Sequence, residues 1–333
     1  MRRSVYLYVF RRFLQSLFVL WVIITILFFF FRLAPGNPLA AYIDTTFTEE
    51  QQAALMARFG LDKPLYMQYF IYLGNVVRGD LGDSFFRGDS VINVIGEALP
   101  NTLYLTLTSL LFAYLLGVVG GIFYASQRGK SVERGGLVLT LITRAAPEFW
   151  VGMILLALFA FQLRWLPSSG TGGAATIYSS ELDKLTSPEF WRHMLLPMTT
   201  LALYLHGLPL LLMRSNMLEV MDQDFITMGR LIGYSERRLM IQHAARNAML
   251  PVITALALGV GYSIGGNVVI ENVFGWPGLG RLLVRAVSSS DYPVAQGAFV
   301  IIAAIIVLLN FIADVLYSLL DPRVGSSDAA AAS

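Results

Sequence analysis

The sequence predicts an all-α integral membrane protein with a helical subdomain outside the bilayer. Hydrophobic residues make up 56% of its 333 residues, whereas charged residues make up only 14%. A soluble domain usually carries about 25% charged residues, so this composition indicates a chain that lives in lipid. The apolar residues also gather in runs of about 20, the length that a helix needs to cross a bilayer.

The first apolar run, Phe13–Phe31, holds 19 residues, of which only Gln15, Ser16 and Thr25 are polar. As a helix it would span about 28 Å, close to the thickness of the hydrocarbon layer. Four arginines precede it, as in a signal peptide, but the run is longer than a signal core. We therefore expect a retained membrane helix.

Five further spans are expected, which gives six in total and places both termini on the same side. They cover approximately residues 102–125, 135–163, 194–213, 250–269 and 294–316. With the amino terminus in the cytoplasm, the inner segments hold more Lys and Arg than the outer ones. This count leaves out the long first outer segment, because long loops cross the membrane largely regardless of charge. We therefore expect both termini in the cytoplasm.

The predicted organisation has four parts. Residues 1–33 form the cytoplasmic amino terminus and first span, and residues 34–100 form an external helical subdomain. Residues 101–324 form a five-helix membrane core that includes a cytoplasmic loop at 216–250, and residues 325–333 are expected to be a disordered tail.

Composition excludes several kinds of chemistry. The chain has no cysteine, so it forms no disulfide or thiolate metal site, and its three histidines are far apart in sequence. Its net charge of +2 gives no indication of a nucleic-acid partner. The tripeptide Gly129–Ser131 resembles the end of a phosphate-binding loop, but Tyr124 stands where that loop needs a glycine. We therefore expect neither a metal site nor an ATP site in this chain.

The cytoplasmic loop carries the strongest functional signal. Apolar and polar residues alternate with helical spacing up to Gly233, where a turn is expected, and a second helix follows with Ser235 as its cap. One interpretation is a helix at the membrane surface, with its basic residues facing lipid head groups.

The stretch 224–253, "DFITMGRLIGYSERRLMIQHAARNAMLPVI", resembles the loop that couples permeases of bacterial ABC importers to their ATPases. Other stretches resemble the dipeptide, oligopeptide and nickel importer permeases: "PGNP" (35–38), "GLDKPLYMQY" (60–69), "RGDLGDSF" (78–85), "WLPSSG" (165–170), "ENVFGWPGLGRLLV" (271–284), "DYPVAQG" (291–297) and "DVLYSLLDPRV" (314–324). These matches follow one another in order over nearly the entire chain.

This resemblance implies a six-helix ABC importer permease that moves peptides across the inner membrane by alternating access, or a nickel-chelate or oligosaccharide importer of the same family. The implied partners are a second homologous permease subunit, two ATP-binding subunits, an extracytoplasmic solute-binding protein and membrane lipid. ATP and Mg would be bound by the partner subunits. The residues implied to couple the chain to its ATPase are Asp224, Gly229, Arg230, Gly233, Glu236, Arg237, His243, Asn247 and Pro251.

The first half of the loop departs from the family pattern, which has small residues and a basic residue before the glycine. Gly229, Leu231 and Ile232 occupy those places here. The sequence therefore does not identify the ATPase that this loop binds.

Three polar residues lie within the expected spans: Arg144, Glu148 and His206. An ionised group at membrane depth costs several kcal/mol unless it pairs or faces water, so each is a candidate for the translocation pathway. In the alternative, Arg144 and Glu148, four residues apart on one helix, neutralise each other, and His206 bonds to a neighbouring helix. The pairs Gly117/Gly121 and Gly261/Gly265 have the spacing that lets membrane helices pack closely.

Two other classes of protein remain as alternatives. An intramembrane enzyme would need a nucleophile paired with a base, or a carboxylate cluster, and the sequence offers no convincing one. A channel would need no ATPase partner, so co-purification with an ATPase would separate it from an importer.

Overall fold

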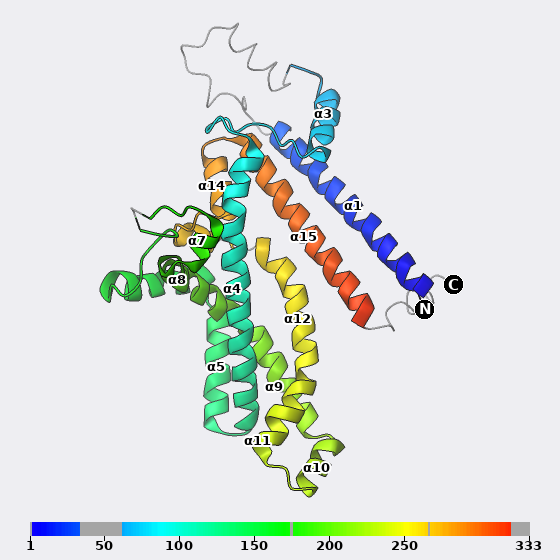
Figure 1. Cartoon of the computed structure of the whole chain (residues 1–333), viewed down its shortest axis with the longest axis vertical. Coiled ribbons are helices and arrows are strands. Elements are labelled where there is room, and N and C mark those ends of the chain that lie inside the picture. Colours follow the sequence, from blue (N-terminus) through cyan, green and yellow to red (C-terminus); the bar gives the residue numbers. More distant parts are fainter. Residues whose placement is uncertain (1, 34–61, 174–175, 266, 321–333) are drawn as a thin grey trace. The chain divides into compact units, whose positions relative to one another are not determined.

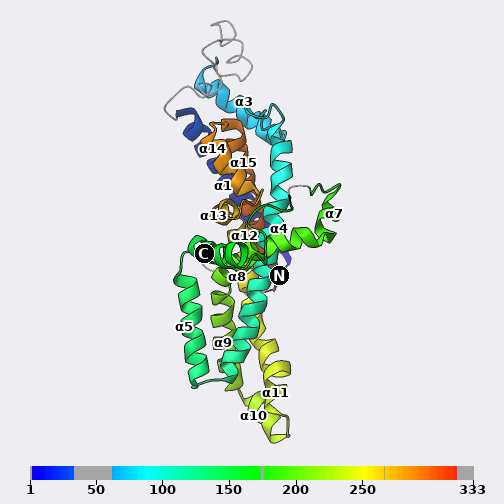
Figure 2. The ribbon, with the colours of Figure 1, turned by 90° about the vertical axis from the view of Figure 1, so that its left-hand side faces the viewer.

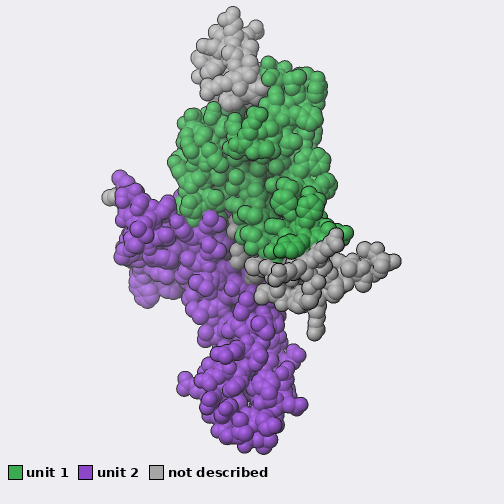
Figure 3. Space-filling model, turned by 45° about the vertical axis from the view of Figure 1, so that its right-hand side comes forward, with its two compact units in different colours: residues 1–102, 278–333 green, residues 103–277 purple. Residues whose placement is uncertain are grey.

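The structure is a computed structural model that describes residues 2–33, 62–173, 176–265 and 267–320 (Figure 1). These residues form helices and loops without a β-strand, and the chain divides into two compact units (Figure 3). The first unit comprises residues 1–102 and 278–333, and the second comprises residues 103–277. The "PGNP" stretch and the expected tail at 325–333 lie outside the described residues.

The first unit is built on two long helices that pack along each other, α1 (Arg2–Leu33) and α15 (Tyr292–Leu320). Aromatic side chains hold them together, with the rings of Phe13 and Phe311 6.0 Å apart and those of Phe31 and Phe299 6.2 Å apart. Helix α3 (Leu65–Val77) packs on α1, and α14 (Leu279–Ser288) packs on α15. The described part of the expected outer subdomain, 62–100, thus contains α3 and the start of α4, joined by a loop.

Helix α4 (Val91–Ser126) begins within the first unit and continues into the second. The helix therefore begins before the expected span 102–125, and Pro100 lies inside the helix. The turns before the proline are stabilised by packing, since Val91, Val94 and Ile95 are buried in the core of the first unit. Burial here outweighs the tendency of proline to mark a helix end.

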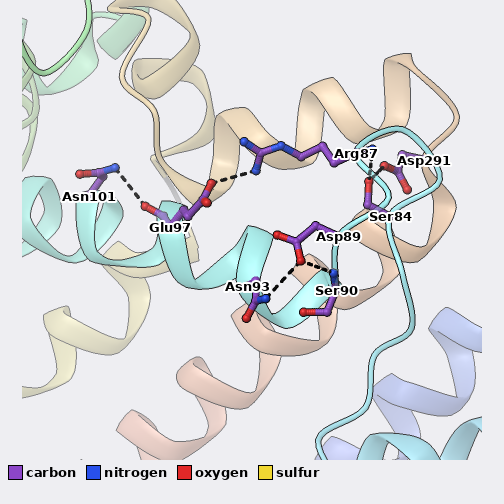
Figure 4. A network of polar contacts seen from close by, with 8 residues as sticks. All are labelled: Ser84, Arg87, Asp89, Ser90, Asn93, Glu97, Asn101 and Asp291. Atoms are coloured by element: carbon purple, nitrogen blue, oxygen red, sulfur yellow. Dashed lines mark hydrogen bonds and ion pairs between the residues drawn. The ribbon is translucent and has the colours of Figure 1, made fainter. Parts of the chain in front are cut away.

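A polar network ties a loop of the first unit to the start of α15 (Figure 4). The Asp291 carboxylate accepts hydrogen bonds from Ser84 Oγ at 2.5 Å, Phe85 N at 3.1 Å and Phe86 N at 3.3 Å. Ser84 Oγ in turn accepts from Arg87 N at 2.9 Å. Ser84 and Asp291 are both buried, so the structure brings together the stretches "RGDLGDSF" and "DYPVAQG", 207 residues apart.

The second unit contains the remaining helices. They are α5 (Ser131–Ala145), α6 (Glu148–Leu155), the π-helix η1 (Leu156–Gln162), α7 (Glu181–Thr186), α8 (Pro188–Leu205), α9 (Gly207–Met221), α10 (Asp224–Leu231), α11 (Glu236–Arg238), the π-helix η2 (Leu239–Ala244), α12 (Ala245–Gly265) and α13 (Val268–Val273). Figure 2 shows α10 and α11 beyond the ends of α4, α5 and α9.

Glycines allow α4 and α9 to approach closely. A Cβ atom at Gly117 would lie 2.6 Å from Pro209 Cγ, and one at Gly121 would lie 2.6 Å from Met213 Cβ. No residue larger than glycine fits either position without moving α9. The packing role predicted for this pair is confirmed, whereas the side chains around Gly261 and Gly265 lie outside the described part.

Within the described residues, three helices are long and apolar enough to cross a membrane: α1, α4 and α15. Two bent helix pairs, α5 with α6–η1 and α8 with α9, raise this number to five if each is one span. The fifth expected span, 250–269, includes most of α12 but is not one helix, because α13 begins separately at Val268. The count of six therefore stays a prediction.

The third expected span, 135–163, is not a continuous helix. It bends by 103° between α5 and α6, at Ala146 and Pro147. Pro147 cannot donate a backbone hydrogen bond and disfavours helical geometry at the residue before it, and Ala146 is accordingly extended, with ψ 138°. The fourth span bends by 45° at His206, just before Pro209.

Replacing Asp291 with alanine should destabilise the first unit. The change leaves one hydroxyl and two amide donors without their acceptor, which we expect to cost about 2–4 kcal/mol in the free energy of unfolding. Thermal unfolding of the purified protein in detergent, followed by tryptophan fluorescence, measures the effect. Asp89→Ala is the matched control, because Asp89 accepts from Ser90 N and Asn93 Nδ2 but is exposed. Equal melting temperatures for the two variants would contradict this role of Asp291.

Candidate functional site

A helical hairpin, here the coupling unit (residues 224–244), lies between α9 and α12. Helix α10 ends in a turn at Gly233, whose amide donates to Arg230 O at 3.0 Å, while Tyr234 N donates to Gly229 O at 3.0 Å. Gly233 has φ +89°, a conformation that other residues adopt only with strain. No atom lies within 4 Å of a Cβ built there, so the glycine is required for backbone conformation and not for space.

The coupling unit shares a hydrophobic core with the helices beside it. Ile226 of α10 is fully buried, and a Cβ at Gly229 would lie 2.6 Å from Leu239 Cδ2, so α10 packs tightly on η2. The same cluster contains residues of α4, α9 and α12: Leu110, Tyr114, Met213, Met217, Val220, Ala245, Ala248 and Val252. The hairpin is therefore anchored in the second unit and does not hang from it as a free loop.

Polar contacts close the two arms of the hairpin. Ser235 caps α11 by accepting from Arg238 N at 3.4 Å, as the sequence predicts. Arg230 Nε donates to Glu236 Oε1 at 2.8 Å and Arg230 Nη2 to Glu236 Oε2 at 3.4 Å. These hydrogen bonds hold the pKa of Glu236 below and that of Arg230 above their usual values. The pair is therefore ionised at neutral pH, although it is exposed and screened by salt.

A stack of side chains lies on the second arm. The Arg238 guanidinium sits 4.2 Å from the centre of the Tyr234 ring, which in turn stacks on His243 at 5.6 Å. His243 O accepts from Asn247 Nδ2 at 2.8 Å. The coupling residues predicted from the sequence did not include Tyr234, Ile226 or Leu239, although the helical spacing of apolar residues in the loop contains the last two.

Other residues predicted for coupling are placed along the same unit. Asp224 begins α10, Arg237 is exposed on α11, and Pro251 lies inside α12, two turns beyond His243. The structure thus brings Gly229, Arg230, Gly233 and Glu236 together at the turn, and leaves Pro251 away from it.

The outer face of α10 is apolar. Its exposed large side chains are Phe225, Met228 and Leu231, followed by Ile232 in the turn; Leu231 is 79% exposed. Arg230, Glu236 and Arg237 lie beside them along the chain. Contiguous exposed apolar surface with a charged rim is typical of a binding site for another protein.

A buried ion pair joins α5 to α9 within the second unit. Two nitrogens of Arg214, Nε at 2.8 Å and Nη2, donate to Glu133 Oε1. Glu133 Oε2 accepts from Gly129 N at 2.6 Å, so both carboxylate oxygens are satisfied. Nearby, Arg128 pairs with Asp222, the residue that follows α9. Sequence reasoning missed the Glu133–Arg214 pair, whose members are 81 residues apart.

The three intramembrane candidates lie at the two helix breaks. Arg144 is in the last turn of α5 and Glu148 in the first turn of α6, so they are not neighbours on one helix. The proposed Arg144–Glu148 pairing is wrong, because the 103° bend separates them and no ion pair joins them. His206 Nδ1 donates to Leu203 O at 2.7 Å, within its own helix and not across to a neighbouring one.

Comparison with known families assigns the chain. The family model described as "Binding-protein-dependent transport system inner membrane component" matches residues 117–326, and "Binding-prot-dependent transport system membrane comp, N-term" matches residues 5–106. The chain belongs to this family. It is therefore a membrane subunit of a transport system, and the all-α membrane fold predicted from sequence is confirmed.

This inner membrane component is similar to named permeases along most of its length. It is 37% identical to the oligopeptide transport system permease protein AppB of Bacillus subtilis (strain 168), over 95% of this chain and 98% of that protein. It is 37% identical to the di/tripeptide transport system permease protein DppB of Pseudomonas aeruginosa (strain UCBPP-PA14), over 88% and 91%. It is 33% identical to the glutathione transport system permease protein GsiC of Salmonella choleraesuis (strain SC-B67), over 95% and 98%. These relatives confirm the resemblance predicted from the sequence motifs.

Proposed function

We propose that this chain is the permease subunit of an ATP-driven importer of peptides. The support is that the relatives are named as permeases for oligopeptides, for di- and tripeptides and for glutathione. The complete importer would contain a second homologous permease, two ATP-binding subunits and an extracytoplasmic solute-binding protein. ATP and Mg would be held by the ATP-binding subunits, and this chain would supply the path and the coupling.

The observation that carries the coupling proposal is the exposed apolar face of α10. An ATP-binding subunit would bury Phe225, Met228 and Leu231 in a groove, while Arg230 and Glu236 hold the hairpin in shape. A helix set in a groove of a partner is a common mode of recognition. The same face would enter the lipid interface if the hairpin lay on the membrane. Site-directed cross-linking from Leu231 distinguishes an ATP-binding subunit from lipid as the partner of this face.

Movement of the coupling unit would reach the membrane helices by direct packing. Ile226 and Leu239 share a core with Met213 and Met217 of α9, and Arg214 of α9 holds Glu133 of α5. Closure of the ATP-binding subunits would thus displace α9 and α5 together and change access to the path. ATP can shift the equilibrium between the inward-open and outward-open states only if the docked coupling unit differs between these two states.

The path is proposed to pass the two helix breaks, where Arg144, Glu148 and His206 lie. Interrupted helices expose backbone groups at membrane depth, which is tolerated where protein or water satisfies them. A nickel chelate or an oligosaccharide is the alternative solute. Identification by mass spectrometry of the solute trapped in the purified importer would decide between them.

The proposed orientation places both termini and the coupling unit in the cytoplasm. Because the chain has no native cysteine, single cysteines report exposure without interference. A cysteine at Phe86, which is 75% exposed, should react with an impermeant thiol reagent added outside the cell, whereas one at Ser235 should not. The opposite pattern of labelling would overturn this orientation.

Replacing Gly233 with valine should uncouple ATP hydrolysis from uptake. A side chain at φ +89° costs about 1–2 kcal/mol, and more for a β-branched residue, so the turn should open. Uptake by the reconstituted importer should fall at least about tenfold, the factor for 1.4 kcal/mol, while membrane insertion and basal ATPase activity persist.

The matched control is Gly233→Asn, because asparagine tolerates the left-handed conformation better and a Cβ meets nothing there. Asparagine should retain most of the transport. Unchanged uptake and solute-stimulated ATPase activity in the valine variant would refute the proposed role of the turn.

A further inference from the structure

The two helix breaks of the second unit meet at Arg144. This residue occupies the last turn of α5, directly before the 103° bend. Its side chain lies against Gly207, the first residue of α9 after the 45° bend, since a Cβ built on Gly207 would lie 3.3 Å from Arg144 Cδ and 3.6 Å from Arg144 Cβ. The aliphatic part of Arg144 is therefore held between two interrupted helices.

The guanidinium of Arg144 has no anionic partner in the part of the chain that the structure describes. None of the ion pairs there includes it, and the residue is exposed. Glu148, the nearest carboxylate in the sequence, begins the helix on the other side of the bend. A cation at such a position is stable only beside water or an anion.

The placement of Arg144 beside both breaks favours a solute as that anion, because the proposed path passes these breaks. It lies thirteen residues after Ser131, where α5 begins, which is about 20 Å along the helix. A lipid phosphate is the rival anion, and an arginine held by lipid would not distinguish a peptide acid from its amide.

We propose that Arg144 binds the carboxylate of the transported peptide. This inference rests on the proposed peptide import and adds the group that recognises one end of the solute. A planar guanidinium donates two parallel hydrogen bonds to a carboxylate, and that match makes arginine a selective carboxylate binder. Gly207, which has no side chain, leaves room for the aliphatic part of Arg144 at this point.

The test compares trialanine with trialanine amide, which lacks the carboxylate charge. Uptake of each is measured in proteoliposomes that contain the assembled importer with its binding protein saturated. Wild type should prefer trialanine. Arg144→Gln should lower trialanine uptake about tenfold or more and leave uptake of the amide within about twofold, because a charge-assisted hydrogen bond is lost only for the acid.

Arg134→Gln is the matched control, since it removes an exposed arginine from the same helix near its start. It should leave the ratio of acid to amide uptake as in wild type. An unchanged ratio in Arg144→Gln, or an equal change in Arg134→Gln, overturns the inference. If Arg144 instead pairs with a carboxylate of the second permease, both peptides lose uptake equally, which also overturns it.

Failure of the variant to assemble and failure of wild-type uptake lead to different conclusions. If Arg144→Gln does not assemble, Arg144→Lys decides, because it keeps the charge and loses the paired geometry; a reduced preference for the acid supports the inference, and an unchanged preference overturns it. If wild type takes up neither peptide, the proposed function fails and this inference fails with it. Uptake of both by wild type with an unaltered ratio in the variant rejects the inference alone.

Discussion

A hydrocarbon layer offers no water to unpaired backbone amides, and this constraint determines most of the architecture. Helices α1, α4 and α15 satisfy it because each is long, apolar and continuous enough to cross the layer. The same constraint makes the two interruptions of the second unit unusual. At each of them a proline, Pro147 or Pro209, removes a donor and leaves carbonyl groups that need another partner. Such backbone is tolerated only where protein or water reaches it, which is why the proposed path passes the breaks.

The coupling unit and the breaks are connected by packing within the second unit. Ile226 and Leu239 are buried in the same core as Met213 of α9, and Arg214, the next residue on that helix, holds Glu133 of α5. Both oxygens of Glu133 are satisfied, so separating the helices would leave a buried carboxylate without partners. Densely packed helices transmit displacement instead of absorbing it. In the proposed coupling, a movement of α10 would reach α9 through this core and the first turn of α5 through Glu133.

The sequence was sufficient for features that depend on local pattern. Apolar runs predicted α1 and α15, and Gly233 with Ser235 predicted the turn and cap of the hairpin. Features that depend on tertiary packing were not predictable. Burial of Val91 and Ile95 stabilises the turns of α4 that precede Pro100. No local pattern links Glu133 to Arg214. The Arg144–Glu148 pairing failed for a different reason. It assumed a helix through Pro147, although the proline was itself the signal of a break.

We propose that the outer face of α10 docks on an ATP-binding subunit. Site-directed cross-linking tests it most directly, with a cysteine at Leu231 carrying a short photo-activated cross-linker in the assembled importer. The account predicts a covalent adduct with the ATP-binding subunit from Leu231, whose side chain is 79% exposed, and none from the control position Phe86. Adducts from Leu231 with lipid alone would show that the hairpin lies on the membrane surface, and would contradict the account.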